Sequence, residues 1–301
     1  MPTDHSPFPV PRQNRVREFI QSFSPEDLRN CSVVVANRTG GQGKTLVAQL
    51  VSLCFEGAGI TKHLAAADTA DLSRCSKLGK LFREQVTELG LGATIDAVRS
   101  DPNRAVAHWD ALGELLCAGD VVVDLGANLV DMVWDWAAAR QAGSILRSPR
   151  IPRIVLVVPV RAQAQALEDA FTVLERSIKE NDNLPLAGRI LVLNEASGPF
   201  SQYGNNSDFE RIQAMKHNAG LKVMSLAQCR SEIWPTLERN HVPIAKVARM
   251  ETNEFGEEFG LDRFAASGAR ADFLTWLEKI IADFQRIGLV PPAPKERESR
   301  G

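Results

Sequence analysis

Residues 33–46 read Val-Val-Val-Ala-Asn-Arg-Thr-Gly-Gly-Gln-Gly-Lys-Thr-Leu. A short β-branched run leads into a glycine-rich turn, and an amphipathic stretch over 45–55 follows the turn. This order predicts a strand, a turn and a helix. Glycines allow positive φ angles and close backbone approach, so the amides of such a turn can converge on an anion. The positive end of the following helix adds to that attraction.

The turn contains the residue types that bind the phosphates of a nucleotide. We expect Lys44 to supply a positive charge to the β- and γ-phosphates of ATP and the Thr45 hydroxyl to bind Mg²⁺. The other expected cofactor-binding residues of this loop are Gly40, Gly41, Gln42, Gly43 and Leu46. The usual P-loop pattern has glycine where this sequence has Arg38. A glycine turn with a surface lysine is the alternative, and the flanking strand and helix favour the phosphate loop.

Short apolar runs alternate with longer amphipathic stretches along the chain. Strands are predicted over 32–36, 63–67, 94–98, 121–125, 154–160, 190–194 and 222–226. A helix is predicted over 45–55, with Leu46, Leu50 and Leu53 on one side, and another over 164–178. Continuously apolar strands are typical of sheets covered on both faces. The pattern predicts an α/β fold, a mostly parallel sheet with helices on both faces and ligands at the carboxyl ends of its strands.

Acidic residues lie at the carboxyl ends of two of these strands. Asp124 closes an apolar run, an arrangement that holds Mg²⁺ through water, and the amide of Gly126 is expected at the γ-phosphate. Asp followed by Gly is also an ordinary turn at a strand end. Asp68 directly follows the run 63–67, and Asp71 lies three residues further on. The alternative for Asp71 is that it caps the next helix.

The loop over 37–45 resembles the deviant Walker A motif of the ParA/MinD partitioning ATPases, a family that includes the nitrogenase iron protein. That motif reads Lys-Gly-Gly-x-Gly-Lys-Thr, and this sequence matches it at Gly40, Gly41, Gly43, Lys44 and Thr45. Thr39 stands where the family has a lysine that reaches the phosphates of a dimer partner. Candidate substitutes for that lysine are Lys62 and Arg38. The resemblance extends in order over about residues 31–230 and implies the P-loop ATPase fold of these proteins.

The resemblance also assigns roles further along the chain. The segment 68–74 is similar to switch I of the family, which implies that Asp68 orients or deprotonates the attacking water. By the same resemblance Asp71 reaches the Mg²⁺ shell. Asn194 matches an asparagine that contacts the adenine ring. Lys44 and Asp68 are therefore the expected catalytic residues, and the expected metal ligands are Thr45, Asp71 and Asp124.

The function implied is a Mg·ATP-binding ATPase that acts as a switch in plasmid or chromosome partitioning, or in plasmid stability or transfer. A homodimer is expected on ATP binding. The expected partner is a DNA-binding adaptor protein, or non-specific DNA that contacts a local basic patch of Arg230, Arg239, Lys246 and Arg249. A solvated charged surface is the alternative for that patch.

Two other functions stay open. Loss of the family's lysine favours a nucleotide-locked binding or scaffold protein with little or no hydrolysis. A small-molecule enzyme on the same architecture, such as an ATP-dependent ligase or a nucleotide kinase, is the third possibility.

Composition excludes several classes of protein. The 301 residues include 35 Lys and Arg against 37 Asp and Glu, a net charge of −2, so a basic coat for nucleic acid is excluded. The apolar runs are too short to cross a bilayer. Residues 1–12 contain four prolines and no apolar h-region, so no secretory signal is expected. A cytoplasmic location is expected instead. The five cysteines and five histidines lack zinc-site spacing.

The expected organisation is a single P-loop ATPase domain over 25–288. Residues 1–24 are expected to be a tail with an extra helix, and 289–301 a flexible tail. One or two closing helices are predicted over 262–287. Their inward-facing residues would be Phe264, Phe273, Trp276, Ile280 and Phe284.

Overall fold

The computed structural model describes residues 30–67, 75–89 and 106–291. Within these ranges seven strands form one sheet in the order β3-β2-β4-β1-β5-β6-β7, and every neighbouring pair is parallel. The strands are β1 Ser32–Val35, β2 His63–Ala67, β3 Val86–Glu88, β4 Val121–Leu125, β5 Ile154–Arg161, β6 Gly188–Asn194 and β7 Lys222–Leu226. With the glycine-rich loop between β1 and the helix that follows it, this is the α/β fold of P-loop NTPases. The predicted fold class is confirmed.

Most of the predicted strands are present. The runs 63–67, 121–125 and 222–226 have the observed bounds, and β1, β5 and β6 differ from prediction by one or two residues. The strand expected over 94–98 lies outside the described residues. The edge strand β3 was not predicted, because three residues are too few to show a periodicity.

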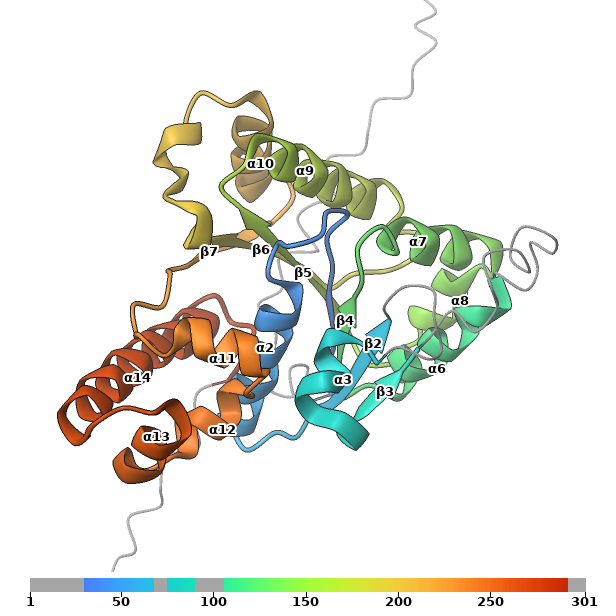
Figure 1. Cartoon of the computed structure of the whole chain (residues 1–301). Coiled ribbons are helices and arrows are strands. Elements are labelled where there is room, and N and C mark those ends of the chain that lie inside the picture. The colour runs from blue at the N-terminus through green and yellow to red at the C-terminus, as the bar shows by residue number, and fades with distance from the viewer. Residues whose placement is uncertain (1–29, 68–74, 90–105, 292–301) are drawn as a thin grey trace, which may run out of the picture.

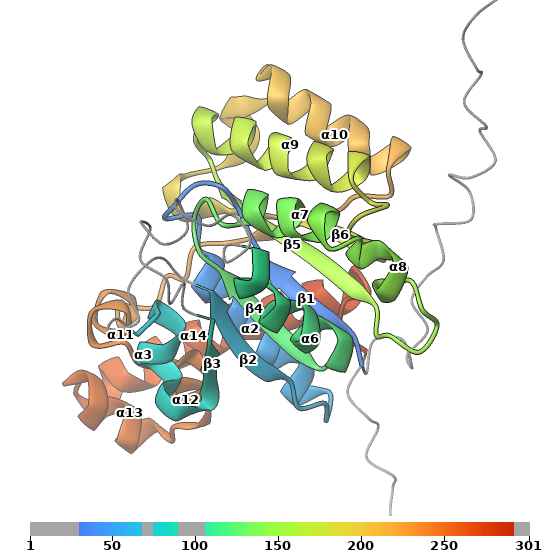
Figure 2. The same cartoon turned by 90° about the vertical axis from the view of Figure 1, so that its right-hand side faces the viewer.

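Helices cover both faces of the sheet (Figures 1 and 2). One face carries α2 Lys44–Gly57, α3 Lys77–Phe82, α11 Trp234–Asn240, α12 Ile244–Arg249, α13 Thr252–Phe259 and α14 Arg263–Arg286. The other carries α6 Asp110–Ala118, α7 Val130–Ala139, α8 Ala142–Leu146, α9 Ala164–Lys179 and α10 Ser207–Asn218. The described residues also include three short 3₁₀ turns: η3 Arg83–Gln85, η4 Glu195–Ser197 and η5 Phe200–Tyr203.

Each central strand divides its side chains between two cores. In β1, Val33 and Val35 belong to the core under α2 and α14, while Val34 belongs to the core under α7 and α9. Successive side chains of a strand point to opposite faces, so a strand buried on both sides must be apolar at every position. This explains why the strands read as continuous apolar runs. Asp124 is the polar exception in β4. It lies at the carboxyl end of the strand, opposite Val35, where β1 leads into the glycine-rich loop.

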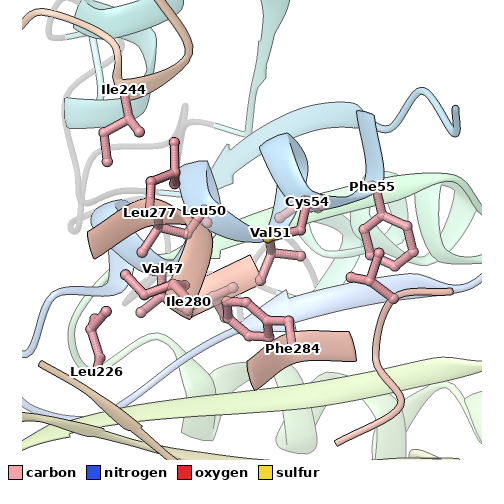
Figure 3. Close-up of a cluster of buried hydrophobic side chains, with 14 of the residues drawn as sticks. Val47, Leu50, Val51, Cys54, Phe55, Leu226, Ile244, Leu277, Ile280 and Phe284 are labelled. Carbon is pink, nitrogen blue, oxygen red and sulfur yellow. The ribbon is translucent and has the colours of Figure 1, made fainter. Parts of the chain in front are cut away.

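Helices α2 and α14 pack against each other on the same face of the sheet, α2 over the central strands and α14 towards β7 (Figure 1), and Figure 3 shows the apolar side chains between them. The buried stripe of α2 consists of Val47, Leu50, Val51, Cys54 and Phe55. Of the predicted stripe, Leu50 is fully buried, and Leu46 and Leu53 are partly buried and pack against the same cluster. Helix α2 contacts the sheet on one side and α14 and α12 on its flanks, so the buried arc of the helix is wider than one row of leucines.

The C-terminal segment closes this core as a single helix. Asp262 caps α14 through its side chain, which accepts hydrogen bonds from the Phe264 and Ala265 amides. Phe273, Trp276, Ile280 and Phe284 are buried as predicted. The prediction for Phe264 was wrong: its side chain is 87% exposed, on the outer side of a helical turn whose Ala266 is buried in the core.

The predicted tails are only partly described. Residues 1–29 and 292–301 lie outside the described ranges, so the division of the chain at 24 remains a prediction. Leu289 and Val290 were assigned to a flexible tail, but both are buried in the core with α14. No helix in the described ranges has the length and apolarity needed to cross a membrane.

Candidate functional site

A cavity of about 320 Å³ lies at the carboxyl ends of the central strands, around the turn that follows β1. Nine of the predicted site residues line it: Gly40, Gly41, Gln42, Gly43, Lys44, Thr45, Leu46, Asp124 and Gly126. Six further residues complete its wall: Ala66, Ser76, Lys77, Ala127, Arg161 and Glu238. The fold therefore gathers the loop and the β4 carboxylate where parallel sheets bind ligands.

A larger hollow of about 760 Å³ lies elsewhere, between η3 and α12. Its walls include Phe82, Arg83 and two residues of the predicted basic patch, Lys246 and Arg249, but none of the predicted nucleotide- or metal-binding residues. Size alone does not identify a site, because binding depends on groups that converge on a ligand. Such groups meet in the smaller cavity.

The loop adopts the conformation that its glycines allow. Gly41 has φ +76° and Gly43 has φ +92°, in the left-handed region where residues with a Cβ are strained. A Cβ on Gly43 would also lie 2.6 Å from Nδ2 of Asn194. Helix α2 begins at Lys44 with no side-chain cap and no acidic residue in its first turn. Its first amides are thus available to an anion at the loop.

Lys44 is held inside this turn. Its side chain is almost buried, and its Nζ donates a 2.9 Å hydrogen bond to the Thr39 carbonyl. An ammonium group removed from water is unfavourable unless polar or charged partners surround it. The geometry keeps a positive charge at the floor of the cavity, where a phosphate would be placed by the loop amides.

Thr45 and Asp124 meet across the junction of α2 and β4. The Thr45 hydroxyl donates a 2.6 Å hydrogen bond to Oδ2 of Asp124. Parallel pairing of β1 with β4 sets Val35 opposite Asp124, which brings the carboxylate beside the start of the loop. Asp124 is nearly buried in this position.

The donor set fits Mg²⁺ bound with a nucleotide. Mg²⁺ takes oxygen ligands and usually keeps several waters, with one or two protein groups beside the substrate phosphates. A hydroxyl and a carboxylate in contact satisfy that requirement. Within the described ranges no group of three or more His, Cys, Asp or Glu side chains forms a metal site. The described side chains alone therefore do not form a complete coordination shell for a metal ion.

Gly126 does not present its amide to the cavity as predicted. Its N–H donates to the Ala67 carbonyl at 2.6 Å and extends the β2–β4 ladder. The amide that links this segment to the phosphate loop is that of Asn128, which donates to the Arg38 carbonyl at 3.0 Å. The segment after β4 is thus tied to the loop through the main chain.

Asn194 supports the glycine-rich loop through a hydrogen bond to its main chain. Its Nδ2 donates to the Gln42 carbonyl at 3.0 Å, and its Oδ1 accepts the Ala196 amide at 3.2 Å. The side chain is buried and is not among the residues that line the cavity. Its amide therefore positions Gln42, and the predicted contact with adenine remains a prediction.

Arg38 and Thr39, which precede the glycines of the loop, are anchored to helices of the same chain. The Thr39 hydroxyl hydrogen-bonds the carboxylate of Asp169 on α9. Arg38 forms a 3.0 Å ion pair with Asp131 on α7. Lys62, the other candidate substitute for the missing lysine, is buried at the amino end of β2, where it bonds Asp120 at 2.9 Å. Neither substitute projects freely from this chain.

Several features of the site escaped the sequence analysis. Asp169 and Asp131 lie far from the loop in sequence, and no local pattern marks them. Arg161 directly follows the predicted strand over 154–160, so its place at a strand's carboxyl end was a usable signal. Asp68 and Asp71 lie outside the described residues, so their predicted roles remain predictions.

Cysteine chemistry is unfavourable in this chain. Burial raises the pKa of Cys31 to about 11 and that of Cys54 to about 12. The pKa of Cys229 is also raised, chiefly by burial. A thiolate is the reactive form of cysteine, so these three side chains are inert near neutral pH.

No protein-family model and no curated protein matches the sequence. Among solved structures, apo McdA from Cyanothece is similar over 79% of this chain and 98% of its own, with 13% identity and a TM-score of 0.43. An ATP complex of a McdA variant gives 13% identity and a TM-score of 0.41, covering 81% of this chain and 96% of its own. MinD in the MinC–MinD complex of Aquifex aeolicus covers 83% and 96%, with 12% identity and a TM-score of 0.39. Since these TM-scores are below 0.5, the function has to be argued from the geometry of the loop.

Proposed function

We propose that this chain binds Mg·ATP at the loop 40–45 and acts as a slow ATPase of the ParA/MinD type. The contact between Thr45 and Asp124 is the observation that carries the proposal. It joins two of the three predicted Mg²⁺ ligands, from distant segments, inside the cavity that also holds Lys44. A glycine turn with a surface lysine would need neither a buried lysine nor an acidic partner for the threonine.

Each group has a defined task in this proposal. The loop amides and the start of α2 bind phosphate oxygens, and Lys44 neutralises the β- and γ-phosphates. Thr45 and Asp124 hold Mg²⁺, which offsets phosphate charge when bound. Asp68 orients or deprotonates the attacking water, and Asp71 reaches the metal shell; both assignments rest on the sequence.

We propose that ATP binding and hydrolysis change the conformation of the protein and the partner that it binds. The Asn128 amide bonds the Arg38 carbonyl, so the segment after β4 responds to movement of the phosphate loop. Loops that contact a γ-phosphate commonly order when it is present and relax after hydrolysis. We expect ATP to favour a homodimer that binds DNA or a DNA-binding adaptor, in partitioning or in plasmid stability or transfer, in the cytoplasm.

The expected basic patch is weakened by internal pairing. Lys246 forms a 2.9 Å ion pair with Glu258, and Arg249 pairs with Glu56. Such pairing favours the alternative, a solvated charged surface, for these two residues. We therefore favour an adaptor protein as the partner over DNA bound directly through this patch.

A second function is favoured by the contact of Thr39 with Asp169. The position that the family uses for its cross-dimer lysine is occupied here by a hydroxyl bound within the chain. This supports a nucleotide-locked binding protein that hydrolyses ATP little or not at all. Steady-state phosphate release with and without DNA and partners separates the two: stimulated turnover rejects the locked protein, and tight binding without turnover supports it.

Binding is tested by Lys44→Ala in calorimetric titration with Mg·ATP. We expect binding to be abolished, and we expect the exposed helix variant Lys179→Ala to bind as the parent does. Undiminished affinity in Lys44→Ala contradicts the proposal. Asp68→Ala should keep ATP affinity and stop phosphate release, and continued release would remove Asp68 from the water-handling role.

A further inference from the structure

Arg161 is the last residue of β5 and lines the cavity of the phosphate loop. The strands β4 and β5 flank β1, so Arg161 approaches the loop from the side opposite Asp124. The main-chain N–H of Arg161 donates a 2.7 Å hydrogen bond to Oε1 of Gln42. The residue is therefore held against the loop by its backbone, independently of its side chain.

The guanidinium of Arg161 lacks an acidic partner within the described ranges. Its Nε is buried and makes no hydrogen bond to any described group. Arg176, in contrast, bonds three carboxylates, and Arg38 pairs with Asp131. A buried donor without an acceptor costs free energy, and the cost is larger for a charged group. An anion that enters the cavity would remove that cost.

Other cations at the cavity are placed differently. Lys44 donates to the Thr39 carbonyl at the floor of the loop, and Lys77 is exposed at the start of α3. Thr39 supplies no charge, and its hydroxyl is held by Asp169. Arg161 is thus the cation with a buried, unsatisfied donor on the β5 side of the loop.

We propose that Arg161 binds phosphate oxygens of the nucleotide, as a second cation beside Lys44. The inference rests on the proposed function and adds to it a residue of the same chain. A guanidinium matches phosphate because its planar fork can donate two parallel hydrogen bonds. The phosphates are then neutralised from two sides, by Mg²⁺ held at β4 and by Arg161 at β5.

Calorimetric titration of the full chain with Mg·ATP tests this role. Arg161→Gln keeps the main-chain bond to Gln42 but removes the charge, so affinity should fall roughly 10- to 100-fold. Arg161→Lys keeps the positive charge but loses the planar guanidinium. Its affinity for Mg·ATP should lie between that of the parent and that of Arg161→Gln. Arg153→Gln is the matched control, since Arg153 is exposed at the other end of β5 and should bind as the parent does.

The outcomes separate this inference from the proposed function. If the parent binds Mg·ATP, Lys44→Ala does not, and Arg161→Gln retains parental affinity, the inference is overturned and the proposed function stands. If the parent itself does not bind Mg·ATP, the proposed function fails. Thermal unfolding of each variant shows whether the fold is kept. A loss of affinity that Arg161→Lys does not partly restore would also overturn the role of charge.

Discussion

The Thr45 hydroxyl lies 2.6 Å from Oδ2 of Asp124, although 79 residues separate them in the chain. Their contact joins the first turn of α2 to the end of β4 and defines one side of the cavity. A threonine and an aspartate in this relation form a pair that can take up Mg²⁺ with its waters when a nucleotide arrives.

Asp124→Asn should weaken the effect of Mg²⁺ on nucleotide binding. The amide keeps the shape of the side chain but loses the negative charge that supports the metal. We expect the gain in ATP affinity on adding Mg²⁺ to fall roughly 10- to 100-fold. Titrations with and without Mg²⁺ measure this gain. The control is Asp182→Asn, whose side chain is 94% exposed, and an unchanged gain in Asp124→Asn would exclude the metal role.

Thr39→Val should lower stability by removing the hydroxyl that bonds Asp169. One hydrogen bond to a charged group at a partly buried site contributes about 1 to 2 kcal/mol. This corresponds to a decrease in Tm of roughly 2 to 8 °C for a domain of this size. Thermal unfolding by circular dichroism provides the measurement. Thr61→Val, at an exposed position, should leave Tm unchanged, and an equal Tm for both variants would mean that the Thr39 contact adds nothing.

Phe284→Ala should destabilise the fold strongly because it opens a cavity between α14 and α2. Phe284 is fully buried in this core (Figure 3), and loss of such a ring costs about 3 to 5 kcal/mol. Phe284→Leu should cost less, since it leaves a smaller void. Urea unfolding gives the free energies. The control is Phe264→Ala, at a position 87% exposed, which should change stability by less than about 0.5 kcal/mol. Similar losses for both alanine variants would contradict the packing described.

Stability should fall at acidic pH through His108. Burial lowers the pKa of this imidazole, and its Nε2 is buried without a hydrogen-bond partner among the described groups. The unfolded chain then binds the proton more readily, so the free energy of unfolding decreases as the pH falls from about 6.5 towards the lowered pKa. Below that pKa both states are protonated, and this residue causes no further change.

Urea unfolding between pH 8 and pH 5 measures that loss. His108→Gln should show a smaller loss over this window than the parent, because glutamine does not titrate. His217→Gln on α10 is the control, since its side chain is exposed and should keep the parental pH dependence. The prediction fails if His108→Gln loses as much stability as the parent.

Much of the fold could be predicted because its signals are local. Strands β2, β4 and β7 were found with their observed bounds: β2 and β4 are mostly apolar runs limited by polar or turn residues, and β7 is a short segment whose Met224 and Leu226 alternate with polar Ser225. The loop was found because glycines followed by a lysine and a threonine, between a strand and a helix, form a pattern that can be recognised along the chain. The β3 strand was missed because three residues carry no periodicity, and Phe264 because a helical pattern does not show where a core ends.

By itself, the amino-acid sequence determined the parallel α/β architecture, the glycine-rich loop after β1 and the acidic residue near the end of β4. Backbone preference, side-chain period and glycine spacing act between near neighbours, so they can be read along the chain. Only the tertiary structure decided that Asp169 holds Thr39, that Asn194 supports Gln42 and that Arg161 faces the loop from β5. Those contacts join segments more than a hundred residues apart, and they arise from the order in which the strands pair.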